Sequence, residues 1–101
     1  FSEGLYVKKD VFDDIYSREG NLQCSTVGSN KRTGGIGDIL SGTIASFLAR
    51  LSSRGSKLKA CAAACDIVRT AAKKSYDARR WSISGTSVLA EIGHAINMKF
   101  P

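Results

Sequence analysis

The feature that most constrains the fold is a glycine-rich run placed directly before a helical pattern of apolar residues. Gly34, Gly35 and Gly37 fall within four positions, and glycine allows backbone conformations and close approaches that other residues resist. Apolar residues then recur at the spacing of one helix face, at Ile36, Ile39, Leu40, Ile44, Phe47, Leu48 and Leu51. The sequence therefore predicts a loop that leads into the first turn of an α-helix.

This loop has the properties of an anion site. The first turn of a helix carries unpaired N–H groups and partial positive charge, which suit a phosphate, and Lys31 and Arg32 add charge upstream. The run has neither the Gly-Lys-Ser/Thr ending of a P-loop nor the glycine spacing of the dinucleotide fingerprint. Two interpretations of Asp38 stay open. It is either a general base for a hydroxyl that attacks phosphate, or a first-turn carboxylate that stabilises the helix dipole.

The remaining chain divides into strands first and helices later. Short β-prone runs occupy residues 4–7, 13–17 and 22–27, and the turn signal between them predicts a hairpin around Gly20 and Asn21. Gly55 is a plausible terminator of the first helix. A second helix is expected over residues 58–78, with a buried stripe at Leu58, Cys61, Ala62, Cys65, Val68, Ala72 and Tyr76. A third helix is expected to follow residues 85–87, whose hydroxyls can cap it, with apolar positions at Val88, Leu89, Ile92 and Ile96.

Length and composition narrow the class of protein. A chain of 101 residues is one small domain or a piece of a larger one, and because it starts at Phe1 we expect a fragment or a processed piece. No apolar run approaches the roughly 20 residues of a membrane helix, so no membrane partner is expected. Three cysteines make a poor disulfide framework. We expect plain buried thiols in a reducing compartment.

The net charge of +6 favours anionic partners. The basic residues occur in scattered pairs rather than in one dense stripe, so small-molecule nucleotides are expected and nucleic acid is not. Trp81 follows two arginines and could stack on a base, but a packed loop anchor is the favoured interpretation. His94 is expected to be structural, and no metal ligands are predicted.

Residues 28–42, GSNKRTGGIGDILSG, closely resemble the signature of the ATP-dependent NAD(P)H-hydrate dehydratases, which belong to the ribokinase-like superfamily. The Gly-x-Gly-Asp core alone recurs across sugar and vitamin kinases, whereas the longer run resembles the ATP-using dehydratases. The resemblance implies an α/β, ribokinase-like fold, of which this chain would be the C-terminal portion. Residues 1–30 would supply strands and turns, residues 31–38 the anion-hole loop, and residues 36–100 the helices.

The resemblance also implies a reaction. ATP would phosphorylate the hydroxyl of hydrated NADH or NADPH, and elimination of phosphate would regenerate the nucleotide. Asp38 would be the catalytic base. The nucleotide-binding positions would be Lys8, Thr33, Gly34, Gly35, Ile36 and Gly37. Two positions depart from the family pattern: Lys9 replaces a usual glycine, and Val88 replaces an acidic residue.

The resemblance implies ATP and Mg²⁺ as cofactors and NAD(P)H hydrate as the substrate. The residues that hold the hydrate and Mg²⁺ lie upstream in the family, so the partner is expected to be the N-terminal part of the domain or a second copy. The compartment would be cytoplasmic or mitochondrial. Alone, the piece should be inactive or marginally stable, because half its helical apolar surface lacks a sheet. The alternatives are a small-molecule kinase of the same superfamily and a non-catalytic basic binding module.

Overall fold

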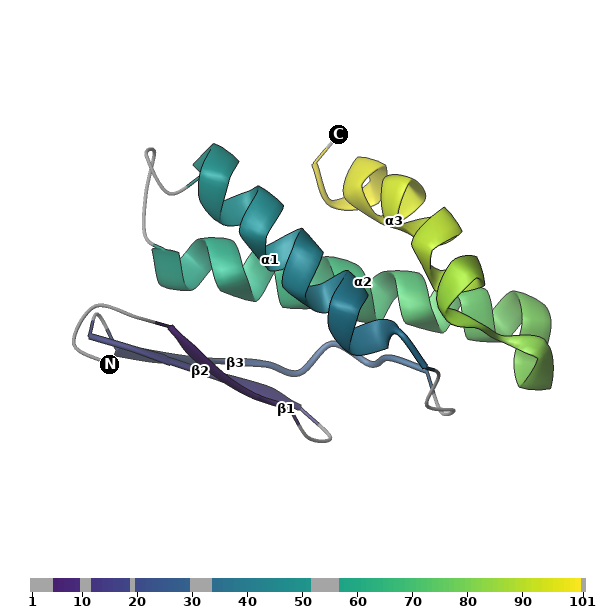
Figure 1. The fold of residues 1–101 in the computed structure, drawn as a ribbon, viewed down its shortest axis with the longest axis horizontal. Helices are drawn as coiled ribbons and strands as arrows, with labels where there is room; N and C mark the ends of the chain where they lie inside the picture. The colour runs from purple at the N-terminus through teal and green to yellow at the C-terminus, as the bar shows by residue number, and fades with distance from the viewer. Residues whose placement is uncertain (1–4, 10–11, 19, 30–33, 52–56, 101) are drawn as a thin grey trace.

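A computed structural model describes residues 5–9, 12–18, 20–29, 34–51 and 57–100. In chain order the elements are β1 (Tyr6–Lys9), β2 (Asp13–Ser17), β3 (Gly20–Cys24), α1 (Ile36–Leu51), α2 (Lys57–Arg79), the short 3-10 helix η2 (Arg80–Ser82) and α3 (Gly85–Lys99). The expected arrangement of strands followed by three helices is confirmed. The sheet lies along one side of α2, and α1 and α3 both pack against α2 (Figure 1).

The three strands form one antiparallel sheet in the order β1-β2-β3. Ile15 of the central strand lies opposite Val7 on one side and Leu22 on the other. A hairpin joins β2 and β3 as expected, but Gly20 and Asn21 belong to β3 and not to the turn. The expected strands over residues 4–7 and 22–27 are wrong in their bounds, because the observed strands cover residues 6–9 and 20–24. Beyond β3 the chain turns to α2, where the carbonyl oxygen of Thr26 accepts a hydrogen bond from Arg69 at 3.3 Å.

The first two helices match the apolar spacing closely, whereas the third begins earlier than expected. α3 starts at Gly85 rather than after Ser87, and Ser84 caps it. The Ser84 hydroxyl accepts the Ser87 N–H at 3.1 Å, and the Ser87 hydroxyl accepts the Ser84 N–H at 2.9 Å. Leu89, which was expected on the buried face, is 59% exposed. Gly55, the expected terminator of α1, lies outside the described residues.

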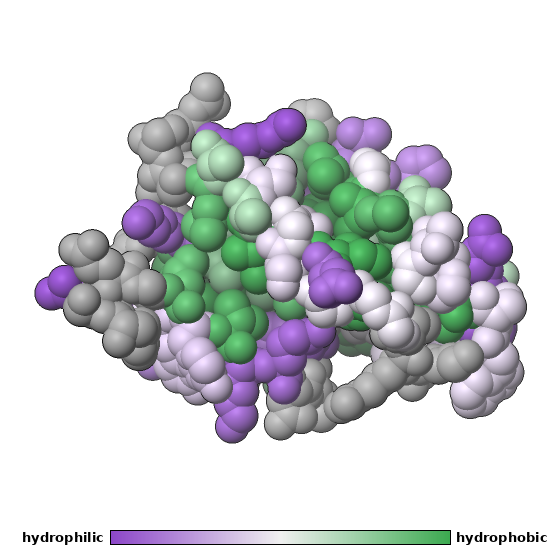
Figure 2. All heavy atoms as spheres, viewed as in Figure 1, coloured by the Kyte–Doolittle hydropathy of each residue, from purple (hydrophilic) through white to green (hydrophobic). Residues whose placement is uncertain are grey.

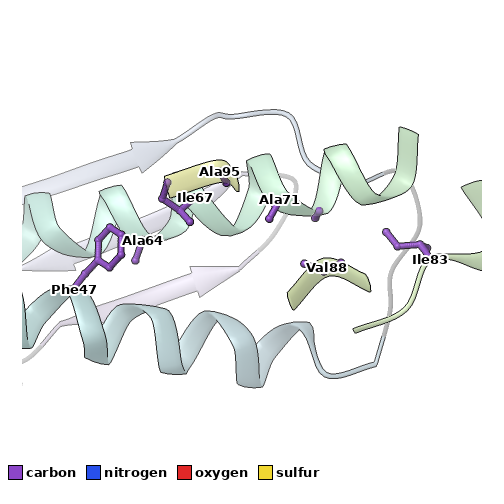
Figure 3. Close-up of a cluster of buried hydrophobic side chains, with 8 residues drawn as sticks. Phe47, Ala64, Ile67, Ala71, Ile83, Val88 and Ala95 are labelled. Carbon is purple, nitrogen blue, oxygen red and sulfur yellow. The ribbon is translucent and has the colours of Figure 1, made fainter. Parts of the chain in front are cut away.

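The core consists of two clusters that meet on α2. One joins the three helices (Figure 3) and contains Phe47, Ala64, Ile67, Ala71, Ala72, Ile83, Val88 and Ala95. The other joins α1 and α2 to the sheet and contains Ile15, Cys24, Leu40, Leu58, Cys61, Cys65 and Val68. Alanine and cysteine side chains on α2 are short, so its neighbours approach closely. α2 therefore fixes the position of α1 relative to the sheet.

A buried ion pair ties the sheet to α2. The Arg69 guanidinium contacts both oxygens of Asp13, with Nε–Oδ2 at 2.7 Å and Nη2–Oδ1 at 2.9 Å. The side chains are 16% and 3% exposed. Hydrogen bonding to Asp13 raises the pKa of Arg69 further above its ordinary value. Because Arg69 also holds Thr26, it positions the segment that leads to the glycine-rich loop.

Candidate functional site

At the start of α1, the glycine-rich loop presents backbone N–H groups that have no backbone hydrogen-bond partner among the described residues. Gly35 has a φ of +88°, a left-handed conformation that favours glycine. Its carbonyl oxygen accepts the Ile39 N–H at 3.0 Å, so the N–H groups of the first turn of α1 precede the helical hydrogen-bond ladder. A Cβ added at Gly34, Gly35 or Gly37 would meet no atom within 4 Å in the described structure. The backbone is therefore accessible to an anion of phosphate size.

Asp38 lies exposed in the first turn of α1. Its carboxylate makes none of the ion pairs found among the described residues. This position stabilises the helix dipole and also leaves the carboxylate free to accept a proton from a hydroxyl held at the glycines. The geometry is compatible with both interpretations of this residue.

A groove of about 800 Å³ runs from Asp38 between the sheet and α1. Aliphatic side chains line most of it, and two lysines add positive charge. Its lining residues come from β1 and the residue before it, from α1 and from the start of α2: Leu5, Val7, Lys9, Gly37, Asp38, Leu40, Ser41, Ile44, Leu48, Lys57 and Cys61. The glycine loop therefore continues into a largely apolar depression rather than into bulk solvent alone.

Only some of the predicted binding residues lie together in the structure. Gly34, Gly35, Ile36 and Gly37 lie together at the N-terminus of α1 beside Asp38, with Ile36 half-buried. Lys8 is exposed on β1, whereas its neighbour Lys9 lines the groove. Thr33, Lys31 and Arg32 lie outside the described residues. The nucleotide contact of Lys8 stays a prediction, and Lys9 and Lys57 are groove residues that sequence reasoning missed.

The expectation that Trp81 is a packed loop anchor is wrong, because Trp81 is 76% exposed. Arg80 adopts a φ of +52° just after α2 and lies 5.5 Å from the Tyr76 ring centroid. Ile83 takes the buried position of this connection and is 5% exposed. His94 agrees with its structural interpretation, since it contacts Glu91 at 3.0 Å on the exposed face of α3.

Gly85, at the start of α3, packs against the backbone of the glycine loop, a contact that the sequence did not indicate. A Cβ built at Gly85 would lie 2.7 Å from the carbonyl oxygen of Gly34 and 3.8 Å from the Cα of Gly35. The N-terminus of α3 therefore packs directly on the backbone of the loop. α3 is itself anchored to α2 by a buried hydrogen bond between the hydroxyls of Ser75 and Ser87 at 2.6 Å.

Gly85→Ala is expected to displace the loop, because the new methyl group cannot remain 2.7 Å from a backbone oxygen. Overpacking of this kind costs about 1–3 kcal/mol, and the affinity of the loop for an anion should fall with it. Gly93→Ala is the matched control on the same helix, since its Cβ would meet nothing within 4 Å in the described structure. That change should stabilise the protein by up to about 1 kcal/mol. Denaturant unfolding and titration of both variants with inorganic phosphate provide the measurement. Equal behaviour of the two variants would contradict the packing role of Gly85.

The expectation of buried thiols is confirmed, since Cys24, Cys61 and Cys65 are all buried and unpaired in disulfides. Cys61 and Cys65 interact across one turn of α2. A hydrogen bond from the Cys65 thiol lowers the pKa of Cys61, and the same bond together with burial raises the pKa of Cys65. Cys61 also lines the groove, whereas Cys65 does not.

A thiol reagent should therefore label Cys61 before Cys65 in the folded protein, because the thiolate is the reactive form. Both should react far more slowly than in urea-unfolded protein, since both are 0% exposed. Mass spectrometry of peptides after timed labelling provides the measurement. Cys65→Ala removes the hydrogen-bond donor and should slow the labelling of Cys61. Faster labelling of Cys65 in the wild type would show that this donor assignment is wrong.

The described residues do not provide a complete magnesium site. No group of three His, Cys, Asp or Glu side chains among them could hold a metal ion. Within the same residues, no helix is both long enough and apolar enough to cross a membrane.

A family model and two relatives point to the same family of proteins. The family model of NAD(P)H-hydrate dehydratase matches residues 4–93. The chain is 31% identical over 98 residues to an ATP-dependent (S)-NAD(P)H-hydrate dehydratase of Pediculus humanus subsp. corporis, covering 89% of this chain and 31% of the relative. It is 31% identical over 96 residues to a protein of the same description in Nematostella vectensis, covering 92% of this chain and 27% of the relative. The chain thus spans less than a third of the length of these relatives.

Proposed function

Because this chain belongs to the NAD(P)H-hydrate dehydratase family, we propose that it carries the phosphate-binding and proton-accepting part of an ATP-dependent NAD(P)H-hydrate dehydratase. The observation that carries the proposal is the juxtaposition of an open glycine cradle at the N-terminus of α1 with Asp38 in the same turn. The relatives from Pediculus and Nematostella are both named for this ATP-dependent activity. A ribokinase-like fold for the whole enzyme is part of the same proposal.

In the proposed reaction Asp38 accepts the proton of the hydrate hydroxyl as that oxygen attacks the γ-phosphorus of ATP. The bond from that phosphorus to the bridging oxygen breaks, and ADP leaves. The C–O bond of the phosphorylated hydrate then breaks, inorganic phosphate departs, and loss of a proton restores the double bond of the reduced nicotinamide ring. The N–H groups at the start of α1 stabilise charge on the transferred phosphoryl group, and such donors are worth several kcal/mol in comparable sites.

Lysine side chains supply charge near this centre. Lys9 and Asp38 line the same groove, so Lys9 is placed to neutralise an anionic group that enters beside the carboxylate. Lys8 occupies the next position on β1 and is exposed. We propose that one or both contact the phosphates of the nucleotide. Mg²⁺, when bound, would neutralise charge on the β- and γ-phosphates, with ligands beyond those that the described residues offer.

The proposal is tested with the natural polypeptide that carries these residues. It is incubated with ATP, Mg²⁺ and NADH hydrate, and the return of the nicotinamide absorbance is followed. Recovery of NADH that depends on ATP is the expected result. Phosphorylation of a different small alcohol, without recovery of NADH, would favour a kinase of the same superfamily. Absence of ATP binding would favour the non-catalytic binding module.

A further inference from the structure

We propose that Ser75 of α2 is a positioning residue for the glycine loop and acts on it through the first turn of α3. Its effect is to keep one backbone donor, the Gly35 N–H, directed at the open side of the loop where an anion would bind. The inference rests on the proposed phosphate-binding role of the loop. It concerns the orientation of a peptide group, and that orientation can be measured with or without phosphate.

The first argument is the orientation of the peptide group between Gly34 and Gly35. A Cβ built at Gly85 would lie 2.7 Å from the carbonyl oxygen of Gly34, so this oxygen faces the first turn of α3. The described chain contains no cis peptide bond, and in a trans peptide the C=O and N–H point in opposite directions. The Gly35 N–H is therefore directed away from α3. A Cβ added at Gly34 or Gly35 would meet no described atom within 4 Å, so the space beside this peptide is open.

The second argument is that this peptide group turns over easily unless a neighbour holds it. Gly35 has a φ of +88°, and glycine adopts positive and negative φ about equally well. A peptide that turned over would present the Gly34 carbonyl oxygen to the anion and withdraw the N–H. Among the described residues, no backbone hydrogen bond holds the Gly35 N–H. The contact of the Gly34 carbonyl oxygen with α3 is therefore the restraint, and the partial positive charge of the first turn of α3 favours an oxygen on that side.

The third argument is the buried pair of hydroxyls that holds the first turn of α3. Ser75 and Ser87 are 1% and 7% exposed, and their Oγ atoms lie 2.6 Å apart. The Ser87 hydroxyl donates to the carbonyl oxygen of Ser84 at 2.8 Å, so its proton is in use and Ser75 is the donor within the pair. Ser84 directly precedes Gly85. The Ser75 hydroxyl thus holds the cap of α3 and, through the cap, the glycine that contacts the loop.

The apolar surroundings of this pair explain why a hydrogen bond is needed there. Ala71 and Ala72, one turn before Ser75, and Val88, next to Ser87, belong to the core cluster that joins the three helices. Apolar side chains also gather between α1 and α3 on the face shown in Figure 2. Apolar contacts have no direction, whereas a fully satisfied buried hydrogen bond specifies one arrangement of the elements it joins. Ser75 therefore fixes how the first turn of α3 meets the loop.

The test uses the natural polypeptide that carries these residues, isotopically labelled at glycine for NMR. The residual dipolar coupling of the Gly35 N–H reports the orientation of that bond and should change in Ser75→Ala. Inorganic phosphate should shift the Gly35 amide signal of the wild type, and Ser75→Ala should weaken this binding about fivefold to tenfold, the usual effect of losing one hydrogen bond. Ile67→Val is the matched control, because it removes one buried methylene from the same core cluster on α2 and leaves the hydroxyl pair intact. It should change neither quantity.

A double-mutant cycle tests whether Ser75 acts through Ser87. Ser87→Ala removes the acceptor, so adding Ser75→Ala to it should weaken phosphate binding no further. Additive effects of the two substitutions would overturn the proposal, as would an unchanged Gly35 coupling in Ser75→Ala. An equal loss of phosphate affinity in Ile67→Val would also overturn it, since Ser75 would then act only through stability. A wild type without a phosphate shift at Gly35 would refute the anion-binding role of the loop, and the coupling would still decide whether Ser75 orients the peptide.

Discussion

Asp38→Asn is expected to reduce turnover of NADH hydrate by roughly a hundred- to ten-thousandfold, the usual contribution of a positioned general base. The amide has nearly the same shape but cannot take the hydroxyl proton. ATP affinity should change little, because the proposed phosphate site is made of backbone N–H groups. Initial rates and ATP titrations in the natural polypeptide provide the measurement.

The competing interpretation of Asp38 makes a different prediction. A carboxylate that only stabilises the helix dipole contributes about 0.3–1 kcal/mol to stability, so its loss would lower the urea midpoint slightly and leave turnover intact. Asp77→Asn is the matched control, since Asp77 is an exposed carboxylate on α2 that pairs with Lys73 at 3.2 Å. It should leave turnover unchanged and lower the stability by at most a few tenths of a kcal/mol, the usual contribution of an exposed ion pair. A fully active Asp38→Asn enzyme would remove Asp38 from the mechanism.

Asp13→Ala is expected to have the largest effect on stability, about 3–5 kcal/mol, because it leaves the Arg69 guanidinium largely buried without its anion. A small domain has only about 5–15 kcal/mol of total stability, so a large share of the protein should unfold at moderate urea concentrations. Urea unfolding of the wild type and the variant provides the measurement.

Two further variants distinguish the destabilisation caused by an unpaired buried charge from the stability that the ion pair itself contributes. Asp13→Leu combined with Arg69→Met removes both charges and should recover much of the lost stability, since hydrophobic replacement of a buried pair is often nearly neutral. Lys73→Ala breaks an ion pair whose side chains are 48% and 54% exposed, and should cost only a few tenths of a kcal/mol. If Lys73→Ala and Asp13→Ala lowered the free energy of unfolding by similar amounts, the large effect of Asp13→Ala could not be due to the burial of Arg69.

Much of the helical fold could be predicted from the sequence because helical signals are local. The apolar spacing after the glycines predicted a helix that begins at Ile36, as α1 does, and the spacing of α2 predicted its bounds to within one residue. The start of α3 was wrong because three hydroxyl residues lie within four positions, and any of them can cap a helix. Only the packing of Gly85 on Gly34 and of Ser87 on Ser75 selects Ser84.

A candidate site could be proposed from the sequence where its residues are contiguous and not where it depends on distant residues. The glycine loop and Asp38 lie within one short run, so a pattern could single them out, and their roles stay predictions. Asp13 and Arg69 are 56 positions apart, and no local signal relates them. Lys57 and Lys9 reach the same groove only because α2 sets α1 against the sheet. Trp81 was misplaced because an aromatic residue in a connection usually packs, whereas here Ile83 fills that position.

The central position of α2 has a consequence for how the protein opens in solution. α2 packs on the sheet, on α1 and on α3, so its amide hydrogens should exchange with deuterium only when the whole domain opens. The amide hydrogens of Ile36, Gly37 and Asp38 precede the hydrogen-bond ladder of α1 and should exchange within seconds. The amides at these three positions would therefore exchange much faster than those of α2. A bound phosphate group would slow the exchange of these amides and leave that of the others unchanged. Because α2 should exchange slowly, hydrogen exchange alone would show whether the proposed anion site at the start of α1 is occupied.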